Sequence, residues 1–143
     1  MPELNADLAL PAVVRAAELA WEPSPSPDVW RKRFYLHGPA ESGLVTSLVR
    51  YERGSRFPAH EHPDGEELLI LEGVFSDEAG DWGAGSYLLN PEGFSHAPFS
   101  KEGCVLFVKL RQYPGKNRRQ IIINTTQAAW QPRPTPGVAA VTL

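Results

Sequence analysis

The sequence predicts an all-β fold, an antiparallel sandwich or barrel, and three observations lead to it. Proline and glycine are frequent, 14 and 12 of 143 residues, without any low-complexity run, which favours many turns and argues against a helical bundle. Short segments rich in β-branched and aromatic residues follow one another along the chain. Turn-forming residues separate these segments at regular intervals, a pattern typical of antiparallel sheets.

The expected strands are of two kinds. Some alternate apolar and polar residues, as a half-buried strand does, and others are continuous apolar runs, as in a buried strand. They lie at 30–37, 44–51, 67–71, 73–76, 86–89, 104–110 and 120–124. Turns are predicted at 38–43 and 52–55, and a hairpin turn at 77–81. Segments 68–71 and 104–108 are apolar on both faces, which favours strands covered from inside and outside, the outer cover being a partner subunit.

Only one segment, 12–20, has the composition of a helix. Because it is short, a strand at 13–14 followed by a single helical turn is the alternative.

Length, charge and cysteine content limit the class of protein. A chain of 143 residues predicts one domain, 1–143, with its core at about 30–125. With Lys+Arg 14 against Asp+Glu 17, the net charge of −3 provides no field that gathers phosphates, so nucleic-acid binding is not expected. The short basic runs 31–33 and 116–119 are interpreted as a solvated strand edge or loop rather than as an anion patch.

The expected location is the cytoplasm. The single cysteine, Cys104, cannot form an internal disulfide, which fits a reducing compartment. The N-terminus lacks the basic region of a signal peptide, and no apolar run is long enough to span a membrane.

A proline-rich motif occurs twice. Residues 20–29 and 129–138 both have the pattern A-W-x-P-x-P-x-P-x-V. Alternate prolines favour an extended backbone that cannot lie inside a sheet, so 21–29 and 130–138 are predicted to form polyproline-like straps, each with its tryptophan in a groove. The second copy is interpreted as the start of another repeat.

Histidines and one carboxylate suggest a metal site. His60 and His62 are two residues apart, so on an extended strand both point to the same face. Glu66 follows the turn at 63–65, and His96 comes from a distant segment. Glu67 is the alternative carboxylate, but strand alternation turns it to the opposite face. Three imidazoles and a carboxylate suit one divalent ion, Zn, Fe, Mn or Ni, and the ligand set does not choose among them.

The same residues occupy two motifs that resemble those of the cupin superfamily. The first motif, G-x5-H-x-H-x3-E-x6-G, is matched by Gly54, His60, His62, Glu66 and Gly73. The second, G-x5-P-x-G-x2-H-x3-N, is matched by Gly85, Pro91, Gly93 and His96, with Ser100 in place of the final Asn. The resemblance implies an RmlC-like jelly roll with His60, His62, Glu66 and His96 as metal ligands.

Within this superfamily, segments 60–67, 71–78, 95–100 and 102–104 resemble the cupin domain of ChrR-type anti-sigma factors. That resemblance implies a sensor of oxidative stress that acts through a partner sigma factor. Sigma-factor binding itself is not expected, because those regulators use a separate N-terminal zinc-containing domain. This sequence has no His/Cys cluster before residue 37 and no length for such a domain.

Two functions follow as hypotheses, and the sequence does not decide whether the protein is an enzyme. The first is a metal-binding single-domain cupin with a sensory or ligand-binding role. The alternative is a mononuclear Fe(II) dioxygenase that acts on a small β-diketone-like or enol substrate. A homodimer is expected with either function, because the missing second repeat leaves a surface that a twin subunit would cover.

Overall fold

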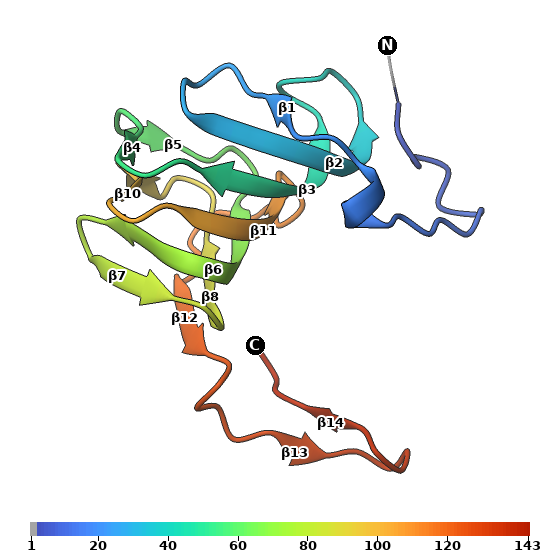
Figure 1. Ribbon diagram of the computed structural model, residues 1–143. Helices are drawn as coiled ribbons and strands as arrows, with labels where there is room; N and C mark the ends of the chain where they lie inside the picture. Colours follow the sequence, from blue (N-terminus) through green and yellow to red (C-terminus); the bar gives the residue numbers. More distant parts are fainter. Residues whose placement is uncertain (1–2) are drawn as a thin grey trace.

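The computed structural model describes residues 3–143 and confirms the all-β prediction (Figure 1). The chain forms a 3-10 turn η1 (Ala16–Glu18) and the strands β1 (Glu22–Pro23), β2 (Val29–His37), β3 (Leu44–Tyr51), β4 (Ser55–Arg56), β5 (His60–Glu61), β6 (Glu66–Asp77), β7 (Gly80–Gly83), β8 (Ser86–Asn90), β9 (Ser95–His96), β10 (Phe99–Ser100), β11 (Cys104–Leu110), β12 (Ile121–Asn124), β13 (Gln131–Pro132) and β14 (Ala139–Ala140).

The long strand β6 organises the fold, and all strand pairs are antiparallel. The main sheet runs β1-β2-β3-β11-β6, and β6 also pairs with β8, which in turn pairs with β12. The distal part of β6 pairs with β7 and, at one residue, with β10, whose other neighbour is β4. Strands β5 and β9 form a separate two-stranded ladder. The sheets enclose one apolar core, and a cavity lined by several of its side chains reaches His60 of β5.

The interior forms because alternate residues of the central strands are apolar. On β11, Cys104, Leu106 and Val108 are buried, and on β6, Leu68 and Ile70 are buried. The register sets Leu106 opposite Ile70 and Val108 opposite Leu68, so one layer of side chains fills the space between strands. Full burial of each such side chain contributes about 1.5–3 kcal/mol.

The predicted strands at 67–71 and 73–76 are one continuous strand with a bulge. Across from β11, Glu72 pairs with Val105 while Ile70 pairs with Leu106, so Leu71 is the extra residue. Gly73 follows with a φ of 73°, and a Cβ there would lie 2.0 Å from the carbonyl oxygen of Gly103. Glycine is therefore required where the strand bends.

The predicted helix at 12–20 is wrong except for the turn Ala16–Glu18, and the alternative strand at 13–14 does not form either. No residue of η1 is buried. A short helix needs tertiary packing of an apolar face, and this segment has none.

The two proline-rich motifs form the same hairpin. In the first, Glu22–Pro23 pairs with Trp30–Arg31 at the sheet edge. In the second, Gln131–Pro132 pairs with Ala139–Ala140. Asp28 and Gly137, which occupy the same motif position, both have positive φ, 60° and 77°. The straps are thus edge hairpins, which proline tolerates, rather than free polyproline segments.

The two hairpins differ in what they contact. Trp21 lies against Lys32 and Arg50, with the cationic groups 4.8 and 4.7 Å from its ring. Trp130 is 51% exposed, and the β13–β14 hairpin stands apart from the barrel (Figure 1). The first tryptophan thus has cationic side chains of the barrel as neighbours, whereas the second is half exposed.

Within residues 3–143, no helix has the length and apolar character that a membrane span requires.

Candidate metal centre

His60 and His62 lie at the open end of the barrel on one short extended segment. Their ring centroids are 4.6 Å apart, as expected for side chains that leave the same side of a strand. The Nδ1 atom of His60 lies 2.9 Å from the carbonyl oxygen of Pro58. Because a carbonyl oxygen only accepts, Nδ1 carries the proton, and the Nε2 lone pair is left to bind a ligand.

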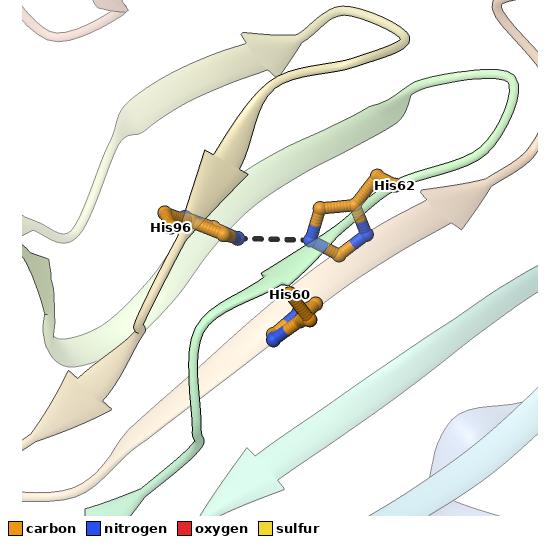
Figure 2. A group of neighbouring side chains, drawn as sticks. All are labelled: His60, His62 and His96. Carbon is orange, nitrogen blue, oxygen red and sulfur yellow. Dashed lines mark hydrogen bonds between the residues drawn. The ribbon is translucent and has the colours of Figure 1, made fainter.

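His96 joins them through strand pairing. β9 pairs with β5 so that His96 stands directly opposite His60. The Nε2 atoms of His62 and His96 are 2.8 Å apart, and Figure 2 shows these two nitrogens facing each other, with His60 beside them. Ligand atoms of the three histidines all lie within 4.8 Å of one another.

Glu66 reaches the same point from the start of β6. Its Oε2 atom is 3.2 Å from Nε2 of His62 and 3.6 Å from Nε2 of His96. The turn before it depends on Gly65, which has a φ of 77° and where a Cβ would lie 2.7 Å from the carbonyl oxygen of Tyr113. Glu67 points away and accepts a hydrogen bond from Tyr87 at 2.7 Å.

Burial shapes the protonation of these groups. It lowers the pKa of His62 to about 3, with the neighbouring His60 and His96 charges adding to the effect. Burial also lowers the pKa of His96, against the hydrogen bond to Asp77, which raises it. Burial raises the pKa of the Glu66 carboxyl to about 7, against a hydrogen bond from Asn90 that lowers it. His62 and His96 are therefore neutral near pH 7, which is the form that ligates metals.

The donor spacing suits a divalent ion. Bonds of about 2.0–2.1 Å from one ion would set neighbouring donor atoms about 2.9 Å apart at right angles and about 3.4 Å apart in a tetrahedron. The three separations among His62, His96 and Glu66 are 2.8, 3.2 and 3.6 Å. The residues present thus fit the metal that the motifs imply.

Two buried residues support the site and were not identified from the sequence. Asp77, which lies in the predicted hairpin turn, is 3.1 Å from Nδ1 of His96. Asn90 donates to Glu66 Oε2 at 3.1 Å and accepts from Gln120 at 2.8 Å. A polar residue at a strand position expected to be buried is the sequence signal that could have identified Asp77 and Asn90. Only the pairing of the strands shows which proposed metal ligand each of them contacts.

A cavity of about 280 Å³ adjoins the cluster. Apolar side chains from several strands form most of its wall, and Tyr51, Phe57, His60, His62 and Glu66 also line it. The lining also includes Ser24 and Ser26 of the first proline-rich hairpin, Arg31 and the 54% exposed Glu41. The site therefore combines an apolar chamber with a few polar groups, the usual composition of a small-molecule site.

The interpretation of 31–33 as a solvated edge is wrong for two of its residues. The side chains of Arg31 and Arg33 are only 20% and 15% exposed. Both contact the Glu41 carboxylate, Arg31 at 2.6 and 2.9 Å and Arg33 at 3.1 Å. The inner face of β2 carries these arginines at alternate positions, beyond Val29, and this is why they are shielded from solvent.

An antiparallel barrel with a histidine cluster at its open end defines a protein of the cupin class. The profile of the ChrR cupin-like domain matches residues 10–114, and the chain belongs to this family. No curated protein matches the sequence significantly.

Solved structures share the fold. The Rhodobacter sphaeroides anti-sigma factor ChrR, in complex with SigE, is 22% identical, with a TM-score of 0.56 over 67% of this chain and 51% of that one. This chain thus spans about half the length of the ChrR chain that it matches. An RmlC-like cupin from Ralstonia eutropha is 22% identical, with a TM-score of 0.60 over 86% and 82%. A Nostoc punctiforme protein described as a candidate dioxygenase is 17% identical, with a TM-score of 0.62 over 81% and 47%.

Proposed function

We propose that the protein is a metal-dependent ligand-binding cupin that holds one divalent ion through His60, His62, Glu66 and His96. The observation that carries the proposal is the convergence of His62, His96 and Glu66, whose donor atoms lie within 3.6 Å of one another. The neutral state of His62 and the proton position on His60 support it, because both leave a lone pair directed at the cluster. Zn, Fe, Mn and Ni all accept this ligand set.

The bound ion would supply Lewis acidity toward a small molecule in the cavity. The residues of the chain would fix the imidazole rings, exclude water from the apolar wall and leave the cavity side of the site open to a ligand. In a sensory role, loss of the ion would release the four ligands and lower the stability of the fold.

The test is the metal content of the protein purified anaerobically without added ions or an affinity tag, measured by elemental mass spectrometry. We expect a nearly stoichiometric divalent metal in the wild type and its loss in His62→Ala. His37→Ala is the matched control, because His37 lies on β2 and pairs with Glu3 at 2.8 Å, away from the cluster. Wild-type protein without metal, or equal losses in both variants, would refute the proposal.

A second candidate function is a mononuclear Fe(II) dioxygenase for a small β-diketone-like or enol substrate. The cavity beside the histidines favours it, because substrate would have room next to the ion. Oxygen uptake by Fe(II)-loaded protein across a panel of diketones and enols tests it, with His60→Ala as the inactive control. An absence of uptake across the panel would exclude this activity.

The proposal includes a homodimer in the cytoplasm. The register sets Leu48, Phe107 and Leu69 side by side, on the face opposite to the interior, and continues this row to Tyr87 and Ile123. An apolar row across a sheet exterior supports a second copy of the chain as its cover. Cys104 is a buried free thiol, as expected in a reducing compartment. The sigma-factor partner of ChrR is not part of the proposal.

A further inference from the structure

The segment before the first strand carries many of the exposed apolar side chains of the molecule. Ten large apolar side chains are exposed in residues 3–143, and half of them belong to this segment: Leu4, Leu8, Leu10, Val13 and Val14. Leu8, Leu10 and Val13 are 82, 66 and 89% exposed. Single apolar side chains on a surface are normal, whereas a concentration of them marks a contact with another molecule.

Contacts with β2 hold this segment at both ends. Leu4 exchanges two backbone hydrogen bonds with Leu36, each of 2.9 Å. At the other end, the Nζ atom of Lys32 donates to the Ala16 carbonyl at 2.7 Å. Residues 6–15 therefore form a loop with fixed ends, and Figure 1 shows this part of the chain projecting away from the barrel. The anchored loop presents its leucines to solvent rather than to the barrel.

A groove of about 650 Å³ separates this segment from β2. Its volume equals that of about twenty water molecules, which is room for more than one side chain. Leu8 and Leu10 do not line the groove. Its apolar lining comes from both sides, namely Leu4, Val13, Val14, Leu19, Ala20 and Leu36. One copy of the chain thus carries both exposed leucines and an apolar groove that they do not fill.

The loop adjoins the apolar row on the barrel exterior. Lys32, which holds Ala16, pairs across the sheet with Leu48, the first residue of that row. The row has only five side chains, all of them already partly buried, whereas a standard interface takes about 20–30 residues from each side. A second copy seated on the row therefore needs more surface, and the loop provides apolar surface next to it.

The charges of the loop region favour a protein partner over a lipid surface. Among the side chains of residues 3–18, the acidic ones are Glu3, Asp7 and Glu18, and the only basic one is Arg15. Segments that bind anionic lipid carry an excess of lysine and arginine. This segment has the opposite balance.

We propose that residues 6–15 are an arm that holds a second copy of the chain, with Leu8 and Leu10 of each copy in the groove of the other. Because each copy has both the arm and the groove, the exchange is reciprocal, as a two-fold interface requires. The inference rests on the homodimer of the proposed function and assigns part of its contact surface.

Sedimentation velocity of the full chain over a concentration series tests the arm. Leu10→Ser should raise the dissociation constant of the dimer at least about tenfold, because it removes an apolar contact from the interface. The matched control is Leu143→Ser, since Leu143 is also exposed, at 58%, but lies at the opposite end of the sequence. It should leave the dissociation constant unchanged.

Disulfide formation between two variants tests the contact itself. Cys104 is buried, so Leu8→Cys and Leu19→Cys each add one accessible thiol. Mild oxidation of an equimolar mixture should give a covalent dimer that contains one chain of each variant, identified by its mass. A mixture of Leu143→Cys and Leu19→Cys is the control and should give none.

The outcomes separate the arm from the proposed homodimer. A dimer that Phe107→Glu disrupts but Leu10→Ser leaves unchanged would overturn the arm and keep the homodimer, as would a dimer in which the mixed disulfide does not form. A monomeric wild type would refute both. If that monomer also floats with phosphatidylcholine vesicles, the loop binds lipid instead. Metal content, measured on the same samples, reports separately on the metal site.

Discussion

The Nδ1 atom of His96 lies 3.1 Å from Oδ2 of Asp77, and both side chains are only 1% exposed. This hydrogen bond fixes the ring so that Nε2 points at His62 and Glu66. A carboxylate behind a metal-bound imidazole also makes the imidazole a stronger ligand, and its loss costs about 10–100-fold in metal affinity.

Asp77→Asn is therefore expected to weaken metal binding by about 10–100-fold while the fold is retained, because the amide has nearly the same shape. Competition with a chromophoric chelator measures the affinity. Asp81→Asn is the control, since Asp81 lies in the same hairpin but accepts its hydrogen bond from Ser76. Unchanged affinity in Asp77→Asn would mean that this carboxylate does not position the ligand.

A second prediction concerns the proton on Glu66. With its pKa raised to about 7 by burial, this carboxyl is mostly protonated at pH 6 and mostly ionised at pH 8. Metal binding requires the carboxylate, so the proton leaves when the metal enters. Glu66 should thus release about 0.9 proton at pH 6 and about 0.1 at pH 8.

The dependence of the binding enthalpy on the ionisation enthalpy of the buffer gives the number of protons released. Glu66→Gln has no carboxyl to ionise, and other titrating groups contribute similarly in both proteins, so the difference between them isolates Glu66. A difference that is the same at pH 6 and pH 8 would contradict the assignment.

The fold and the proposed ligand set could be inferred from local patterns, while the supporting residues could not. His60 and His62 are recognisable because a spacing of two residues fixes their common direction on a strand. Asp77 and Asn90 contact His96 and Glu66 only through pairing between segments distant in sequence. A charged run such as 31–33 predicts exposed side chains, because charged residues are usually exposed, whereas Arg31 is shielded by its position on β2 and by its contact with Glu41.

The apolar row on the barrel exterior leads to a prediction about assembly. Phe107 lies between Leu48 and Leu69 in this row and stacks on Phe34 at 6.3 Å between ring centroids. Phe107→Glu would place a charge in the proposed interface and should convert the dimer to a monomer. Sedimentation velocity at micromolar concentration distinguishes the two states, and Lys109→Gln, on the same face of β11, is the control. A monomeric wild type under these conditions would rule out the dimer.

The duplicated proline-rich hairpins provide an internal comparison of one sequence motif in two environments. Trp21 lies against the cationic groups of Lys32 and Arg50, whereas Trp130 is half exposed and its indole Nε1 donates to the Thr125 carbonyl at 2.9 Å. Trp21→Ala should therefore lower the free energy of unfolding by about 1–3 kcal/mol, through lost cation–π and packing contacts. Trp130→Ala should change it by no more than about 0.5 kcal/mol. Urea denaturation followed by far-UV circular dichroism measures both, and equal losses would show that the second hairpin supports the barrel as much as the first.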